Sequence, residues 1–177
     1  TISITGGFQA AEDLLAFTND GVTMGGITGS YNAVTGVLTL TGPATVAQFQ
    51  AAMRAVTYKD TSDAPNTGNR TISFKVNDGA LDSNVATKTV SVAAVNDAPV
   101  VTTSGGTTAS TEQVAVAIDA ALTVADADSA NLASATISIT GGFQAAEDLL
   151  AFTNDGVTMG GITGSYNAVT GVLTLTG

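Results

Sequence analysis

The sequence contains no cysteine and no histidine. These absences exclude disulfide bonds, the common zinc sites, catalytic histidine dyads and imidazole acid or base chemistry. An enzyme built on this chain would therefore need a mechanism that uses carboxylates. A cysteine-free acidic chain is suited to export from a bacterium, which favours an extracellular location at the cell surface.

Positive charge, aromatic residues and long apolar runs are also scarce. Charged residues make up 11% of the chain, and 15 acids oppose 5 bases to give a net charge of −10. Nucleic-acid binding is not expected, because it requires clustered lysine and arginine. No apolar run approaches the roughly 20 residues of a membrane span. Divalent cations are the natural counterpart of such a chain.

A long internal repeat is present. Residues 1–42 recur without a change as residues 136–177, so the repeat period is 135 residues, the distance from Thr1 to Thr136. Packing tolerates many substitutions at solvent-facing positions, so complete identity indicates recent duplication. A period of this length fits a whole domain rather than a solenoid unit. We expect the chain to be a segment of a longer protein built from domains in series.

Most of the repeat has the pattern of antiparallel β-structure. Alternating segments rich in threonine, valine and isoleucine predict strands, since one face of each would be buried. The predicted strands are residues 1–5, 36–42, 70–76 and 87–95, with further candidates at 114–119, 122–126 and around 16–18. Turns are predicted at residues 31–36 and 77–79.

One helix is predicted at about residues 45–56. Val46, Phe49, Met53 and Val56 follow helical spacing, and Thr45 with Gln48 has the pattern of a capping box. This helix is expected to cover one side of the β-structure. A second, shorter helical turn is predicted at residues 8–13, and the LLAF segment that follows fits a strand equally well.

Acidic residues gather in the predicted connections rather than in the strands. They are Asp60 and Asp63, Asp78 and Asp82, Asp97 beside Asn96, and Asp126 with Asp128. Calcium takes six to eight oxygen ligands from carboxylates, amides and backbone carbonyls. Asp126 and Asp128 lie two residues apart at a strand end, so both can reach one side of a loop. A solvated polar turn is the alternative interpretation.

Four segments resemble the motifs of cadherin repeats, and they occur in cadherin order. LTVADADSANLASATISI resembles a strand that leads into AxDxDxxxN, and VSVAAVNDAP resembles the linker DxNDNxP. YNAVTGVLTL resembles the FxIDxxTGxIxT hairpin, and FKVNDGALDSN resembles the AxDGG strand end. The chain is similar in this respect to the bacterial cadherin-like repeats of giant secreted adhesins, including those of the RTX type.

The resemblance implies a mainly β fold, a cadherin-like or Ig-like antiparallel β-sandwich with one inserted helix. It also implies Ca²⁺ ligands at the matching positions, which are Asn96, Asp97, Asp126, Asp128, Glu112 and Asp78. In the cadherin layout Glu112 and Asp78 serve neighbouring junctions, which leaves the other four at the junction of residues 95–100. The implied division is residues 1–95 in one repeat, a linker at 96–99 and residues 100–177 in the next.

The sequence also departs from the cadherin pattern. Ala94 replaces the first aspartate of the linker, the second linker asparagine is missing, and PATVAQFQ stands where LDRE is expected. Fewer carboxylates imply fewer or weaker calcium ions than the three per junction of animal cadherins. Glu12 with Asp13, and their copies Glu147 with Asp148, are acids near the inserted segment that could supply further ligands. Alternatively, each is an ordinary surface pair.

These observations favour a non-catalytic extender of a bacterial adhesin, whose partners are the neighbouring repeats of its own chain. Calcium would stiffen the junctions and so project a distal binding domain. The alternatives are a glycan- or protein-binding module that uses Tyr31, Tyr58 and Phe17, and a repeat that packs laterally in a surface lattice or filament. An enzyme is the least favoured class, because the acids have no pattern of a confined site.

Overall fold

A computed structural model describes residues 1–177. By its internal contacts the chain divides into two compact units, Thr1–Asp128 and Ser129–Gly177. We refer to these as unit 1 and unit 2. The predicted division into residues 1–95, a linker at 96–99 and residues 100–177 stays a prediction.

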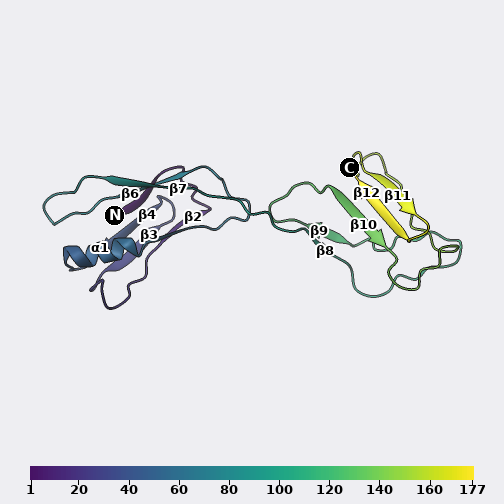
Figure 1. Ribbon diagram of the computed structural model, residues 1–177, viewed down its shortest axis with the longest axis horizontal. Coiled ribbons are helices and arrows are strands. Elements are labelled where there is room, and N and C mark those ends of the chain that lie inside the picture. Colours follow the sequence, from purple (N-terminus) through teal and green to yellow (C-terminus); the bar gives the residue numbers. More distant parts are fainter. The chain divides into compact units, whose positions relative to one another are not determined.

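Unit 1 contains nine strands and one helix (Figure 1). The strands are β1 (Ile2–Gly6), β2 (Asp13–Ala16), β3 (Thr28–Asn32), β4 (Val37–Thr41), β5 (Thr57–Asp60), β6 (Arg70–Phe74), β7 (Ala86–Val90), β8 (Val100–Thr102) and β9 (Thr123–Ala125), and the helix is α1 (Val46–Arg54). Five of the strands form an antiparallel sheet in the order β3-β4-β1-β6-β7. Two smaller antiparallel pairs are β2 with β5 and β8 with β9.

Unit 2 contains one antiparallel sheet. Its strands are β10 (Ser134–Ser138), β11 (Thr163–Asn167) and β12 (Val172–Thr176), in the order β10-β12-β11. No helix of the structure is both long and apolar enough to cross a membrane. The predicted fold class is confirmed: the protein is mainly β, with antiparallel sheets and a single short helix.

The core of unit 1 follows from the alternation along its strands. Ile2 and Ile4 of β1 are buried, as are Leu38 and Leu40 of β4, because successive side chains of a strand point to opposite faces. Leu15 of β2, Ala52 of α1, Ile72 of β6, and Met24 and Ile27 from the loop before β3 complete the cluster. The apolar face of the sheet is thus covered by β2, α1 and this loop.

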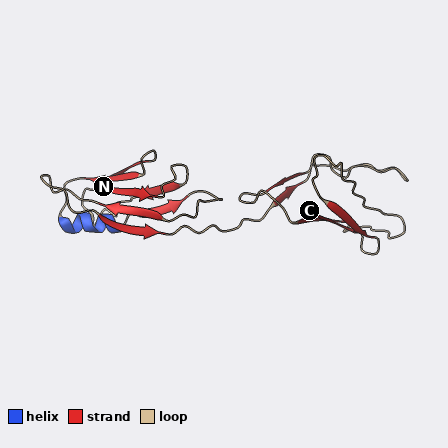
Figure 2. Ribbon diagram, turned by 90° about the horizontal axis from the view of Figure 1, so that it is seen from above, coloured by secondary structure: helices blue, strands red, loops and turns tan.

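The helix begins as its capping pattern predicts. Thr45 Oγ1 accepts the Gln48 backbone N–H at 3.2 Å, and the Thr45 backbone N–H donates to Gln48 Oε1 at 2.8 Å. The helix ends at Arg54, two residues before the predicted end, because β5 begins at Thr57. Figure 2 shows α1 beside the strands of unit 1.

The tight turn between β3 and β4 is confirmed at residues 31–36. Asn32 O accepts the Gly36 N–H at 2.9 Å, and the Asn32 side chain accepts the N–H groups of Val34 and Thr35. Gly36 has a φ of +67°, which strongly favours glycine. A β-carbon at this position would also lie 2.9 Å from the ring of Phe8.

Two predicted strands differ in the structure. The strand predicted at 87–95 ends at Val90, because Val90 pairs with Arg70, the first residue of β6. The strand predicted at 114–119 is wrong: Val114, Val116 and Ile118 are exposed and no second strand pairs with them. Apolar alternation therefore needs a neighbouring strand before it becomes β-structure. The region of residues 8–13 contains one turn at 10–12, after which β2 begins at Asp13.

Candidate functional site

The β8–β9 hairpin brings together three of the predicted calcium ligands. Asp97 precedes β8, whereas Asp126 and Asp128 follow β9, and the pairing of Val100 with Ala125 places these two ends side by side. The Asp97 backbone N–H donates to Asp128 Oδ2 at 3.1 Å. The Asp128 backbone N–H donates in turn to Asp126 Oδ1 at 3.1 Å. The antiparallel register therefore accounts for the meeting of residues that lie about thirty positions apart.

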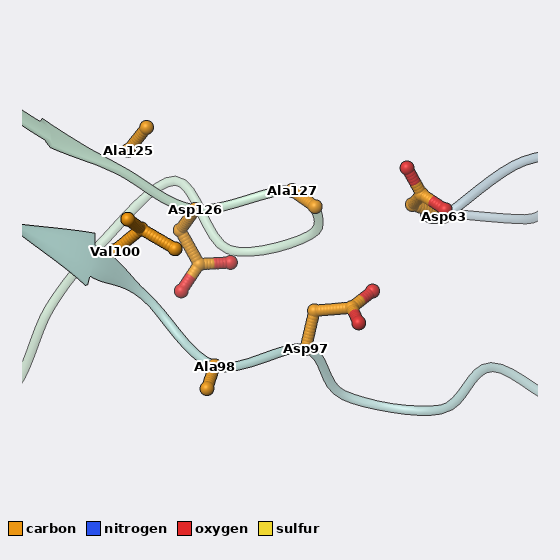
Figure 3. Close-up of a pocket in the computed structure, with 7 residues that line it drawn as sticks. All are labelled: Asp63, Asp97, Ala98, Val100, Ala125, Asp126 and Ala127. Carbon is orange, nitrogen blue, oxygen red and sulfur yellow. The ribbon is translucent and has the colours of Figure 1, made fainter.

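A shallow hollow of about 400 Å³ lies at this end of the hairpin. Its lining includes the carboxylates of Asp63, Asp97 and Asp126, together with Ala98, Val100, Ala125 and Ala127 (Figure 3). We call the group of Asp63, Asp97, Asp126 and Asp128 the junction acids. Figure 3 shows that Asp63, Asp97 and Asp126 stand on three separate stretches of backbone. The lining of the hollow includes three acidic residues and no basic one, a composition that suits a cation better than an anion.

Asp63 is the member of this group that the cadherin resemblance does not indicate. It lies in the loop between β5 and β6, within the segment TSDAPNTG. The tripeptide Asp63-Ala64-Pro65 repeats the tripeptide Asp97-Ala98-Pro99 of the linker. That shared DAP sequence is a signal by which the residue could have been found.

The remaining predicted ligands take other positions. Asn96 is next to Asp97, and its side-chain amino group donates to the Asp97 carbonyl oxygen at 2.6 Å, which leaves Oδ1 as the atom that a metal would use. Asp78 accepts the N–H groups of Leu81 at 2.8 Å and Ala80 at 2.9 Å, and these bonds lower its pKa. Glu112 is exposed between β8 and β9. Neither Asp78 nor Glu112 lines the hollow of Figure 3.

In this structure no three acidic side chains converge closely enough to form a complete metal site. The junction acids are thus a partial set of oxygen donors on one hairpin and one loop. Calcium needs six to eight oxygens, so backbone carbonyls and water would have to complete the coordination. The assignment of Ca²⁺ to these residues stays a prediction.

A second charged cluster in unit 1 is buried. The Arg70 guanidinium contacts both carboxylate oxygens of Asp13 through Nε at 2.9 Å, and its NH2 group lies 3.3 Å from Asp60 and 3.4 Å from Glu12. The side chains of Arg70 and Asp13 are 0% exposed. Tyr58 donates its hydroxyl to Asp13 Oδ1 at 2.6 Å. Burial and this bond to a carboxylate raise the pKa of Tyr58.

This cluster corrects the interpretation of Glu12 and Asp13 as surface or calcium-binding acids. Asp13 is buried and neutralised by Arg70, so it is committed to an internal ion pair. The sequence places Arg70 57 positions from Asp13, and only the fold joins them. In the second copy, Asp148 accepts the Gln144 N–H at 2.8 Å, as Asp13 accepts the Gln9 N–H at 2.7 Å, but no arginine pairs with it.

Comparison with known proteins finds one informative similarity. The chain is 43% identical over 65 residues to halomucin of the archaeon Haloquadratum walsbyi, a match that covers 36% of this chain and 1% of halomucin. The match therefore spans only a small part of that relative's length. No family model matches the chain, and no solved structure matches it.

Proposed function

We propose that this chain is a cadherin-like extender repeat of a cell-surface adhesin of the RTX type, and that calcium stiffens it at the junction acids. The similarity to halomucin, a large surface protein, indicates a repeat of a surface protein. The proposed role is mechanical and needs no catalysis. Its partners would be the neighbouring repeats of the same chain.

One observation carries the calcium proposal: the β8–β9 pairing gathers Asp97, Asp126 and Asp128 at one end of the hairpin, and Asp63 faces the same hollow. The carboxylates of Asp63, Asp97 and Asp126 line one hollow, and like charges that share a hollow repel one another when no cation is bound. A calcium ion would neutralise that repulsion. It would also connect the loop of Asp63 to the linker and the hairpin, which restricts rotation about residues 91–97.

The restricted rotation is the proposed link between binding and function. Between Val90 and Val100 the backbone belongs to no strand, so nothing in the sheet ladders holds this segment straight. Cross-linking its two ends through shared ligands removes hinge freedom without new apolar contacts. Repetition of such a junction along an array would convert calcium binding into length and stiffness.

The test is a calcium titration of the chain by calorimetry, with melting and small-angle scattering measured in calcium and in chelator. We expect calcium to raise the melting temperature and the maximum dimension. A variant with Asp97→Asn and Asp126→Asn should lose both effects. Asp119→Asn is the matched control, because Asp119 is a half-buried acid that accepts hydrogen bonds from Ser104 and lies outside the hollow.

Two results would refute the proposal. One is an unchanged melting temperature and maximum dimension in calcium. The other is a calcium response that survives in the Asp97→Asn and Asp126→Asn variant, which would place the ion elsewhere.

A further inference from the structure

The central sheet of unit 1 contains a gap one strand wide. In the sheet β1 lies between β4 and β6 (Figure 1). Ile2 pairs with Leu38 of β4 and with Phe74 of β6. Beyond this pair Thr1 and Lys75 exchange two backbone hydrogen bonds, at 2.7 and 3.0 Å. If the register is continued upstream, the residues before Thr1 lie between two neighbours. These are Leu40 and Thr41 of β4 on one side and the chain after Lys75 on the other.

The gap is a hollow with apolar walls. Its volume is about 880 Å³, and Leu40 and Gly42 line it on the β4 side while Val76 and Asn77 line it on the β6 side. Phe49 and Met53 of α1 lie against it, and Val46 of the same helix is 88% exposed. A hollow bounded by the end of β4, the backbone that follows β6 and an apolar helix has the chemistry to accept an extended peptide.

The second copy of the repeated sequence shows which residues take this position. In unit 2, Ile137 pairs with Leu173 in the same register as Ile2 with Leu38 in unit 1. There β10 continues two residues upstream of the repeated segment, so that Ala135 pairs with Leu175 and Ser134 with Thr176. Leu175 and Thr176 are the copies of Leu40 and Thr41. The partners that β4 lacks in unit 1 are thus present for β12 in unit 2.

The side chains of this upstream segment suit the hollow. Positions two apart in a strand share a face, so Ala133 and Ala135 lie on the face of Ile137 and Ile139. Ile2 and Ile4, the copies of these isoleucines, point into the core of unit 1. Two alanines would therefore face inward beneath Phe49 and Met53, where a larger side chain would have little room.

We propose that this hollow binds the segment Asn131–Ala135 of a preceding copy of the repeat, which pairs with β4 and with the chain after β6 as an upstream extension of β1. The folding unit of the repeat then begins before the 42-residue identical segment. This inference goes beyond the extender function, because it concerns strand pairing and requires no calcium.

The test attaches a second copy of residues 96–135 ahead of Thr1 of the full chain. Amide hydrogen exchange of residues 39–44 and 75–79 is measured by mass spectrometry, in chelator, with and without this addition. We expect exchange to slow by at least about tenfold at the amides that face the added strand, which are those of Leu40 and Asn77, since these groups gain hydrogen bonds. The other amides of residues 75–79 already donate within unit 1 and serve as internal references. The melting temperature of unit 1 should rise by several degrees.

A matched control carries Ala135→Pro in the added copy only. Proline has no N–H and cannot complete the pairing, so both gains should be lost. The rest of the chain is unchanged in this control, and unit 1 keeps the fold it has without the addition. Unchanged exchange after the addition, or equal protection in the proline control, would overturn the proposal. Because every measurement is made in chelator, these outcomes are separate from failure of the calcium proposal.

Discussion

Arg70 and Asp13 form a fully buried ion pair in unit 1, with Nε of Arg70 2.9 Å from both oxygens of Asp13. Burial disfavours the charge of Arg70, but its bond to Asp13 and the charge of that carboxylate raise its pKa. The pair joins β6 to the first residue of β2. It therefore holds the small β2–β5 pair against the five-stranded sheet.

Loss of Asp13 should destabilise unit 1 strongly. Asp13→Ala leaves a buried guanidinium with only Glu12 and Asp60 as acidic partners, and breaking a buried pair in this way costs about 3 kcal/mol or more. Asp148→Ala removes the identical residue of the second copy, which has no arginine partner, and should cost less than about 1 kcal/mol. Urea unfolding followed by tyrosine fluorescence measures both. Equal destabilisation by the two substitutions would contradict the role assigned to Arg70.

Thr23 should control the pKa of Asp20. The Thr23 hydroxyl and the N–H groups of Val22 and Thr23 donate to Asp20, and they lower the pKa of this carboxyl from 3.8 to about 2. A lowered folded-state pKa means that ionised Asp20 stabilises its loop above about pH 4, and that this contribution disappears as the pH falls towards 2.

Thr23→Val removes the hydroxyl and should raise the pKa of Asp20 part of the way back towards 3.8. The copy Asp155, whose pKa is also lowered to about 2 by Thr158 and neighbouring N–H groups, should be unaffected. An NMR titration of the side-chain carboxyl groups in the variant measures the pKa values of Asp20 and Asp155 in one sample. If the two values move together, or neither moves, the hydroxyl is not the cause.

The capping box of α1 should contribute measurably to stability. Thr45→Ala removes the oxygen that accepts the Gln48 N–H, and such a change costs about 1 kcal/mol. Thr45→Ser keeps that oxygen and should cost much less. Urea unfolding measures the free energy of unfolding of both variants. Similar losses of stability in the two would show that the methyl group of Thr45, rather than its capping oxygen, is responsible.

Asp63 should contribute to calcium binding although it lies far from the linker in sequence. Asp63→Asn removes one of the charged donors at the hollow, and we expect calcium affinity to fall on the order of tenfold. Asp60→Asn is unsuitable as a control, because Asp60 contacts Arg70. Asp119→Asn is suitable and should leave the affinity unchanged in the same calorimetric titration. Equal affinities of Asp63→Asn and the parent chain would remove Asp63 from the site.

Local patterns allowed several elements to be predicted. The alternation of residues 1–5 and 36–42 matches β1 and β4, and Thr45 with Gln48 matches the start of α1. Strand β3 has the sequence TGSYN, which lacks a strong β pattern, and it forms because the turn at residues 31–36 folds it back on β4. Residues 114–119 are the opposite case, because they have the alternating pattern of a strand but form none, since no neighbouring strand pairs with them.

In the candidate site, too, some residues were predictable from local sequence and others were not. The acids at 97, 126 and 128 were identifiable from the sequence, because Asp97 stands in the linker-like stretch VNDAP and Asp126 and Asp128 form a DxD pattern. Asp63 was noted as a loop acid but not predicted as a ligand, since its place at the hollow depends on how the loop between β5 and β6 approaches the linker. Likewise, nothing local distinguishes Asp13 from a surface acid.

The two identical copies of 42 residues separate what sequence decides from what tertiary structure decides. Both form the same hairpin in the same register, and both make the same local bonds at Asp20 and Asp155, because these features depend on neighbours within the copy. The burial of Ile27, which is 1% exposed, and the pairing of Asp13 with Arg70 depend instead on contacts with α1, β5 and β6. These elements lie outside the copy, and no local sequence can replace their contacts.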